Sequence, residues 1–266
     1  MSSSIGFDRA ADYYDETRGF PPGEEGNIAV LYCRAGNLTA DSRVLEIGVG
    51  TGRIALPLAG HVRAVFGIDL SPAMLNRLRA KQRGEPIYIT VGDATRLPFP
   101  SGSVDAVAAA HVFHLISDWP AALREVARVL TPGGVLLDGG NDSGLRNEAD
   151  ALLWDAWDAV AGSYTRRTVG VQREDIDSFL PNAGWRQMGD RLVHRYSIVH
   201  APQIFLDRLE RRVWSSLWSM PDEVIEQGIA AVRETMRQHG IDPQQVIQVE
   251  TGFHVTAYKP PEDAAG

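Results

Sequence analysis

The clearest chemical signal in the chain is a glycine-rich turn that follows a short apolar segment. Glu46 lies near the end of that segment, and Gly48, Gly50 and Gly52 then alternate with other residues. Glycine permits left-handed backbone conformations and lets a ligand approach the main chain closely. A helical pattern follows the turn, and the N–H groups at a helix N-terminus favour negatively charged or nucleotide-like ligands. The stretch therefore predicts a strand, a tight turn and a helix that together bind such a ligand.

The glycine spacing narrows the class of ligand. A dinucleotide-binding fingerprint reads G-x-G-x-x-G, but here the third glycine, Gly52, comes one residue early. Arg53 occupies the position that the fingerprint assigns to glycine. The spacing therefore disfavours a nicotinamide dinucleotide.

Two further acids follow the next two expected strands. Asp69 comes nineteen positions after Gly50, where a carboxylate can accept bonds from both ribose hydroxyls. Asp93 and Ala94 follow the strand after that. The alternatives are a helix N-terminal acid stabilised by the helix dipole for Asp69 and a turn aspartate for Asp93.

Strand-like and helical patterns alternate over the middle of the chain. Helices are expected over residues 7–36 and then between the strands, including one at 53–60 that Pro57 should kink, and the segment 131–134 should end the helix before the fifth strand. This alternation predicts an α/β, doubly wound sheet with parallel strands. The expected strands are residues 43–47, 64–68, 87–91, 104–109 and 135–137.

The regular alternation of strand and helix patterns ends after residue 140. Helical patterns are expected at 148–161, 174–183, 204–217 and 225–240. Strand patterns at 192–199 and 246–258 would complete a seven-stranded, mostly parallel sheet. Five of the six tryptophans lie in this half, so we expect most in a core and one or two at an apolar pocket. The predicted parts are N-terminal cap helices (1–40), a ligand-binding core (41–140), a lid helix with continuing core (141–200), a helical lid insertion (201–242), and a closing strand and tail (243–266).

Taken together, the E-x-G-x-G-x-G turn, the two acids and the segment 123–134 resemble the class I S-adenosylmethionine-dependent methyltransferases, and most closely their type 11 group. The resemblance covers about residues 40–140 and implies the Rossmann-like methyltransferase fold with S-adenosylmethionine as cofactor. It implies that Glu46 and the turn lie beside the methionine portion. It further implies that Asp69 binds ribose, Leu70 and Met74 pack on the nucleoside, and Asp93 and Ala94 contact adenine.

The N-terminal helix and the end of the fourth strand add candidates. In proteins that this chain resembles, a helix with a Tyr-Tyr-Asp element closes over the cofactor, which makes Tyr14 and Arg18 candidates for the methionine end. An amphipathic packing helix is the equal alternative. The resemblance also implies that the main-chain carbonyl of His111 meets the amino group of the methionine portion.

Methyl transfer from a sulfonium needs mainly an aligned acceptor and the exclusion of water. His111 and His114 follow the fourth strand and are the candidate bases, although a hydrogen-bonded wall residue is the plainer interpretation of each. Asp118 could complete a metal site by spacing, but we expect no metal. Motifs of nucleic-acid amino-methylases and of protein arginine methyltransferases are missing, so we expect a small, partly apolar acceptor.

Composition limits the class of protein. The chain has 266 residues, a net charge of −8 and one cysteine, which argues against a nucleic-acid groove and excludes an internal disulfide. No apolar run approaches the ~20 residues that span a bilayer, so we expect a cytoplasmic enzyme without a membrane partner. Two alternatives to a methyltransferase remain open: a non-catalytic S-adenosylmethionine-binding protein and a nicotinamide-dependent oxidoreductase.

Overall fold

The computed structural model describes residues 4–142, 147–165, 169–172, 175 and 177–262. The chain divides into two compact units, each with its own hydrophobic cluster. We call residues 1–141, 169–194 and 253–266 the sheet unit, and residues 142–168 and 195–252 the helical unit. The two strands β6 and β7 continue from one unit into the other.

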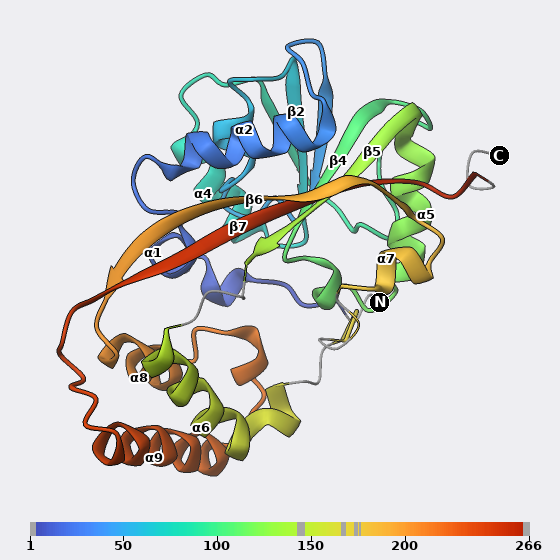
Figure 1. The fold of residues 1–266 in the computed structure, drawn as a ribbon. Helices are drawn as coiled ribbons and strands as arrows, with labels where there is room; N and C mark the ends of the chain where they lie inside the picture. The colour runs from blue at the N-terminus through green and yellow to red at the C-terminus, as the bar shows by residue number, and fades with distance from the viewer. Residues whose placement is uncertain (1–3, 143–146, 166–168, 173–174, 176, 263–266) are drawn as a thin grey trace. The chain divides into compact units, whose positions relative to one another are not determined.

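A seven-stranded sheet in the order β3-β2-β1-β4-β5-β7-β6 organises the fold (Figure 1). Strands β3, β2, β1, β4 and β5 pair in parallel, whereas β7 runs antiparallel to β5. The predicted doubly wound, mostly parallel α/β sheet is therefore confirmed. Its strands are β1 (Arg43–Ile47), β2 (Ala64–Asp69), β3 (Ile87–Val91), β4 (Val104–Ala110), β5 (Leu130–Asn141), β6 (Arg186–His200) and β7 (Ile247–Lys259).

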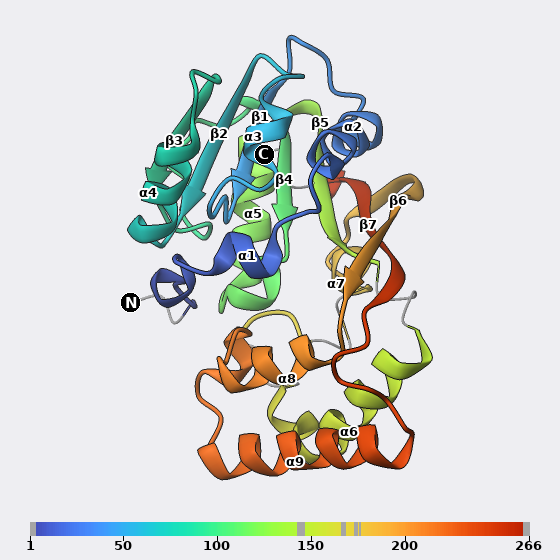
Figure 2. The ribbon, with the colours of Figure 1, turned by 90° about the vertical axis from the view of Figure 1, so that its left-hand side faces the viewer.

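Helices cover both faces of this sheet. Because successive strand residues point to opposite faces, Leu136 packs in the cluster that α5 joins, while Leu137 lies against Gly36 of α2 on the other face. Figure 2 shows α1 near the carboxyl ends of β1 and β4. The helices of the sheet unit are η1 (Asp8–Ala10), α1 (Tyr14–Arg18), α2 (Glu24–Gly36), α3 (Ala55–Leu58), α4 (Pro72–Lys81), η2 (Phe113–Leu115), α5 (Trp119–Val129) and α7 (Phe179–Asn182).

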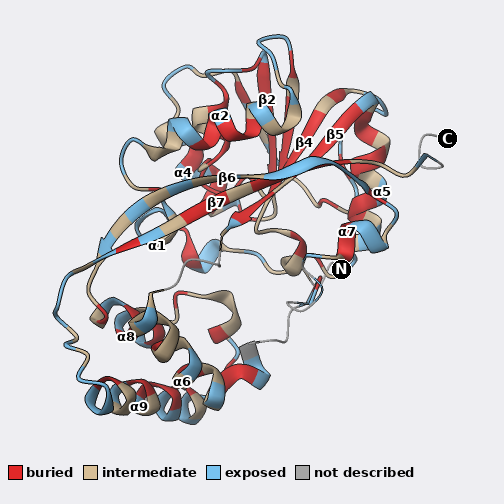
Figure 3. Cartoon of the chain, in the orientation of Figure 1, coloured by how far each residue is buried: buried red, intermediate tan, exposed pale blue. Residues whose placement is uncertain are grey.

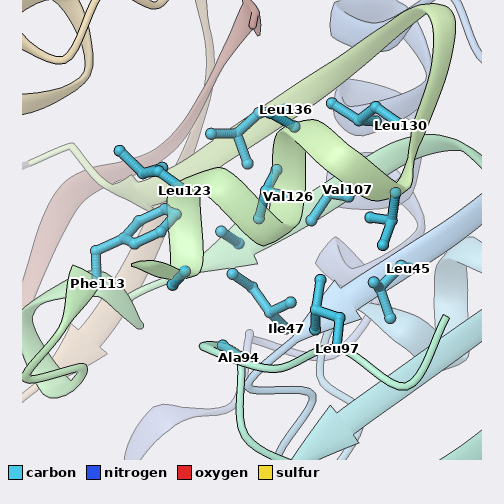
Figure 4. Close-up of a cluster of buried hydrophobic side chains, with 14 of the residues drawn as sticks. Leu45, Ile47, Ala94, Leu97, Val107, Phe113, Leu123, Val126, Leu130 and Leu136 are labelled. Carbon is cyan, nitrogen blue, oxygen red and sulfur yellow. The ribbon is translucent and has the colours of Figure 1, made fainter. Parts of the chain in front are cut away.

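The core beneath α5 holds the central strands in place. Leu45 and Ile47 of β1 and Val107 of β4 are fully buried against Leu123 and Val126 of α5 (Figure 4). Figure 3 shows the same concentration of buried residues along the central strands. Burial of each such aliphatic side chain stabilises the fold by roughly 1.5–3 kcal/mol, so the strand ends that carry the glycine turn are rigidly positioned.

Several local predictions differ from the structure: β6 begins at Arg186 rather than at residue 192, α7 covers only Phe179–Asn182, and one helix and one strand near the site differ as follows. The helix expected over 53–60 is limited to α3, Ala55–Leu58, and Pro57 lies within its first turn, where no N–H is needed, so it does not kink a longer helix. The fifth strand begins at Leu130 rather than at residue 135. Residues 131–134 form a bulge inside it, because Leu130 pairs with Val104 and Val135 with Ala106.

The helical unit is built around a buried tryptophan. Trp157 of α6 lies against Gly228 of α9, where an added Cβ would come within 2.4 Å of the indole ring. His200 contacts Asp150 at 3.1 Å and fastens the end of β6 to the start of α6. Whether this unit acts as a lid stays a prediction. The helices that the unit contains are α6 (Glu148–Thr165), α8 (Gln203–Glu210), η4 (Ser215–Leu217) and α9 (Asp222–Gln238).

The tryptophans follow the expectation in part. Trp157 and Trp185 are core residues, 1 % and 4 % exposed, whereas Trp154 and Trp214 are partly buried and pack on the core of the helical unit. The rings of Trp154, Trp214 and Phe205 contact one another at tilted angles, with ring centroids 4.7–5.9 Å apart. Across the part of the chain that the structure describes, none of the helices has both the length and the apolar character needed to cross a membrane.

Candidate cofactor site

The glycine turn adopts the left-handed conformations that its composition predicts. Gly48, Gly50 and Gly52 have φ values of 69°, 55° and 84°, which side chains with a Cβ rarely adopt. An added Cβ on Gly48 would lie 2.6 Å from Val112, and one on Gly52 would lie 2.2 Å from Leu78. At Gly50 the nearest atoms would be 3.9 Å away. Gly48 and Gly52 thus allow close packing of neighbouring side chains, whereas Gly50 has open space beside its main chain.

Asp69 holds this turn from the neighbouring strand. Its Oδ2 accepts the Gly50 N–H at 2.9 Å and its Oδ1 accepts the Ser71 N–H at 2.9 Å. Burial raises the pKa of Asp69, while the bonds from Ser71 and Gly50 act in the opposite direction. The carboxylate predicted to bind ribose therefore lies directly beside the glycine turn, and it is oriented by two backbone donors.

Asp93 follows the next strand at the same edge of the sheet. Because Asp69 pairs with Val91, Asp93 comes two residues past the level of Asp69. Its Oδ1 accepts the Thr95 N–H and hydroxyl, each at 2.9 Å, so it also forms the turn that the alternative interpretation describes. Ala94 beside it is buried.

Glu46 is the most deeply buried acid of the site, with 3 % of its surface exposed. The backbone N–H of Ala55 donates to its carboxyl group, while its Oε2 is buried without a hydrogen-bond partner. Burial raises the pKa of Glu46 well above its usual value, and the Arg53 guanidinium opposes that shift. An unsatisfied buried carboxyl oxygen is costly, so this oxygen is a candidate acceptor for a ligand donor.

The N-terminal segment is fastened across the turn by hydrogen bonds. Asp15 accepts the Thr51 hydroxyl at 2.5 Å, and Arg53 donates to the Arg18 carbonyl at 2.7 Å. Asp8 accepts the Ser71 hydroxyl at 2.6 Å. The predicted closure of this segment over the turn is thus compatible with the geometry, while the individual roles of Tyr14 and Arg18 stay predictions.

His111 has a left-handed backbone, with φ of 52°, at the end of β4. Its N–H donates to the Gly139 carbonyl at 3.3 Å, and its Nε2 lies 3.3 Å from Asn141 Oδ1. Strain of this kind in a residue other than glycine is concentrated at functional positions.

Both histidines after β4 are neutral near pH 7. Burial lowers the pKa of His111 to about 3, and Arg53 adds to the effect. Burial and Arg18 lower the pKa of His114 to about 4. The two arginines thus act on the imidazoles, which are weak bases and are better suited to orient an acceptor than to take its proton.

The two apolar residues predicted to pack on the nucleoside, Met74 and Leu70, lie near the glycine turn. Met74 is 2 % exposed, and its Cε would lie 3.9 Å from a Cβ on Gly50. Leu70 is half-buried and precedes the N-cap Ser71 of α4. Both therefore lie near the turn, as the nucleoside-packing prediction requires, although no contact with a nucleoside is tested.

Sequence reasoning missed the contact of Arg53 with two aromatic rings beside the turn. The Arg53 guanidinium carbon lies 4.7 Å from the Phe20 ring centre and 5.6 Å from that of Phe253. Phe253 is fully buried, lies two hundred positions further along the chain, and arrives through the antiparallel pairing of β7. No local pattern reveals such a contact; only the position of Arg53 next to the turn was a usable signal.

The described residues contain no group of three or more histidine, cysteine, aspartate or glutamate side chains suited to a metal ion. An open groove of about 660 Å³ lies at the opposite edge of the sheet, where β1 and β2 begin. The glycine turn follows the carboxyl end of β1, so the groove is separate from the candidate site. The residues that line the groove are Asp41, Arg43, Arg63, Ala64, Phe66, Tyr88 and Asp105.

The fold and the turn are those of the class of α/β proteins whose ligand sites lie at the carboxyl ends of the strands. Comparison with known families makes this specific: the family model described as a methyltransferase domain matches residues 45–137. The chain is 30 % identical over 172 residues to a demethylmenaquinone methyltransferase of Beutenbergia cavernae, covering 56 % of this chain and 68 % of the relative. The present chain therefore belongs to the class I S-adenosylmethionine-dependent methyltransferases.

Other relatives agree with this family. A malonyl-[acyl-carrier protein] O-methyltransferase of Serratia marcescens is 31 % identical over 175 residues, which are 66 % of this chain and 61 % of the relative. A solved structure from Anaeromyxobacter dehalogenans, assigned to the type II methyltransferases, superposes with a TM-score of 0.67 at 18 % identity and covers 91 % of this chain and 97 % of that one. This likeness concerns the fold. The chain spans about half the length of several curated relatives that it matches.

Proposed function

We propose that the protein transfers the methyl group of S-adenosylmethionine to a small-molecule acceptor. The observation that carries the proposal is the glycine turn with Asp69 bonded to the Gly50 N–H. This arrangement places an oriented carboxylate, an open stretch of main chain and the buried acid Glu46 at one edge of the sheet. Membership of the methyltransferase family supports the methyl-donor hypothesis over the nicotinamide alternative.

The residues present fit this cofactor. S-adenosylmethionine carries a sulfonium and an ammonium group, and Glu46 Oε2 is a buried acceptor without a partner. Gly50 has space where a Cβ would otherwise stand. Asp69 accepts the N–H groups of Gly50 and Ser71 on its two oxygens, and the carboxylate retains acceptor capacity for ribose.

When bound, S-adenosylmethionine would supply a methyl group activated by positively charged sulfur; the acceptor would form a bond to the methyl carbon as the carbon–sulfur bond breaks, which would leave S-adenosylhomocysteine. The protein's part is to orient and to exclude water. Asp69 orients the nucleoside, Glu46 compensates positive charge, and the segment that contains Asp15 covers the turn. His111 and His114 line the end of β4 as neutral hydrogen-bonding groups.

The acceptor is proposed to be small and partly apolar. Relatives are named for demethylmenaquinone and for malonyl-[acyl-carrier protein], a ring compound and a carboxylic acid carried on a protein. The weakly basic histidines favour an acceptor atom that is already nucleophilic, such as an amine nitrogen or an anionic oxygen or carbon. Arg18 and Arg53, which act on those histidines, favour an anion.

Calorimetry with S-adenosylmethionine and S-adenosylhomocysteine tests the proposal. We expect both to bind; failure of both to bind would overturn it. Incubation with labelled cofactor and panels of carboxylic acids, quinols and amines, read by mass spectrometry, then tests for an acceptor. Tight cofactor binding without methylation of any member would favour the non-catalytic alternative.

A further inference from the structure

The last residues of β5 hold His111 in place. The backbone N–H of His111 donates to the Gly139 carbonyl at 3.3 Å, and its Nε2 lies 3.3 Å from Oδ1 of Asn141. Between these two contacts, an added Cβ on Gly140 would lie 3.7 Å from Cε1 of His111 and 2.9 Å from Cε1 of His254. The first residue after β4 is therefore fastened to the carboxyl end of β5, its parallel neighbour in the sheet.

An aromatic ring on β7 supports the same imidazole. The ring centres of His111 and Phe253 are 6.2 Å apart, with their planes at 76°. Phe253 is fully buried and packs edge-on against Phe20, with ring centres 5.3 Å apart. Across the antiparallel ladder, Phe253 pairs with Asn141. The imidazole thus lies between a rigid ring and the side chain that faces its Nε2, so its orientation is fixed.

The contact with Asn141 determines which ring nitrogen carries the hydrogen. An amide oxygen only accepts, so Nε2 has to donate to Asn141 Oδ1. Burial lowers the pKa of His111 to about 3, so the ring is neutral at pH 7 and has a single N–H. The ionisable groups that add to this shift are Arg53, His114 and Arg18. Nδ1 is then the unprotonated nitrogen, and it makes no hydrogen bond to the residues that the structure describes.

We infer that Asn141 is a positioning residue for His111: it holds the imidazole proton on Nε2 and leaves Nδ1 as the atom through which the ring can accept a hydrogen bond from a ligand. The chemical groups that fit such an atom are N–H and O–H donors. An uncharged amide fixes the tautomer without favouring the imidazolium, as a carboxylate would. That the ligand is the methyl acceptor or the cofactor rests on the proposed function.

The test is the tautomer of His111, measured by nuclear magnetic resonance on the full chain with isotope-labelled histidine. Long-range correlations between ring protons and ring nitrogens distinguish the protonated nitrogen from the unprotonated one, and the signals lost in His111→Gln identify the residue. In the wild type at pH 7 we expect the proton on Nε2. A proton on Nδ1 would mean that Asn141 donates instead of accepting, and it would overturn the inference.

Two substitutions of Asn141, which is exposed, separate its acceptor role from packing. Asn141→Ala removes the acceptor, so the ratio of the Nε2–H form to the Nδ1–H form should fall about fivefold, as for the loss of one neutral hydrogen bond. Asn141→Asp keeps an acceptor, so the proton should stay on Nε2, while the midpoint of the His111 titration should rise by about one pH unit or more. Asn76→Asp, the same change at an exposed position of α4, is the matched control and should alter neither quantity.

An unchanged tautomer ratio in Asn141→Ala, together with an unchanged titration in Asn141→Asp, would show that the two side chains do not interact, and the inference would be wrong. The measurement needs no cofactor, so its outcome is separate from the proposed function. Calorimetry that finds no binding of S-adenosylmethionine or S-adenosylhomocysteine would defeat the methyltransferase proposal and leave the tautomer assignment standing. Thermal melting checks that each variant folds; should Asn141→Ala unfold, Asn141→Asp alone decides through its titration.

Discussion

At the scale of single residues, we propose that the two acids at the turn, Asp69 and Glu46, bind different parts of the cofactor. Asp69 is already oriented by the N–H groups of Gly50 and Ser71, so it is preorganised for a neutral hydroxyl pair. Glu46 is buried with one oxygen unpartnered, which suits a positive group. The chemical type alone does not distinguish them; their surroundings do.

Asp69→Asn should weaken binding of S-adenosylmethionine by roughly 10- to 100-fold, because an amide has one acceptor oxygen for two backbone donors and its NH₂ group would face a backbone N–H. Calorimetry measures the loss. Asp190→Asn, at an exposed position on β6, provides the matched control and should leave binding unchanged. Equal affinities for wild type and Asp69→Asn would show that the carboxylate does not contact the ligand.

The histidines after β4 predict a loss of stability in acid. Because the folded pKa values, about 3 for His111 and about 4 for His114, lie below the unfolded value near 6.5, the unfolded state binds more protons below pH 6.5. Their contribution is therefore present above pH 6.5 and is lost as the pH falls toward 4. Urea unfolding at pH 7 and pH 5 should show a smaller decrease for the double variant His111→Gln/His114→Gln than for the wild type. An identical decrease would refute this assignment.

At the scale of elements, α2 and β5 each contribute a glycine that allows a large side chain of the other element to approach closely. Gly139 on the strand makes room for Tyr32 of the helix, and Gly36 on the helix makes room for Leu137 of the strand. Residues four apart on a helix and two apart on a strand are spaced by nearly the same distance, about 6 Å, so both contacts form together. This contact aligns α2 with the strand end that carries the site.

Gly139→Ala should destabilise the protein by about 3 kcal/mol, because the new methyl group would overlap the Tyr32 hydroxyl and approach Phe253 at 3.1 Å. Gly26→Ala, at an exposed position of α2 where an added Cβ meets nothing, should instead be neutral or stabilising by up to about 1 kcal/mol. Chemical denaturation measures both. Similar stabilities for the two variants would contradict the packing argument.

At the scale of the whole molecule, the chain forms two units with separate cores. The sheet unit is held by the cluster around β1, β4 and α5, and the helical unit by the cluster that contains Trp157 and Leu209. The candidate cofactor residues all belong to the sheet unit. Each unit can therefore be perturbed through its own core.

Trp157→Ala should destabilise the helical unit by about 3–5 kcal/mol, the usual cost of removing a fully buried aromatic ring. Hydrogen exchange should accelerate in α6 and α9, while β1 and β4 keep their protection. The matched variant Leu45→Ala in the sheet unit should show the reverse pattern. Uniform acceleration across the chain in both variants would mean that the two units unfold as one.

The sequence by itself determined the layered architecture and the position of the turn. The spacing of apolar residues indicated the strands and helices, and closely spaced glycines indicated the turn, because these signals lie within a few residues of one another. The family relation supplied expected roles for Asp69, Asp93 and Glu46.

Tertiary structure decided what local patterns cannot encode. The pairing of β7 with β5 brings Phe253 to Arg53, and the packing of α2 on β5 brings Tyr32 to Gly139. The neutral state of His111 and His114 depends on burial by segments distant in the chain. The bulge at 131–134 likewise follows from its register with β4. Burial and charge at a site are sums over all neighbours in space, so they are settled only when distant segments have packed together.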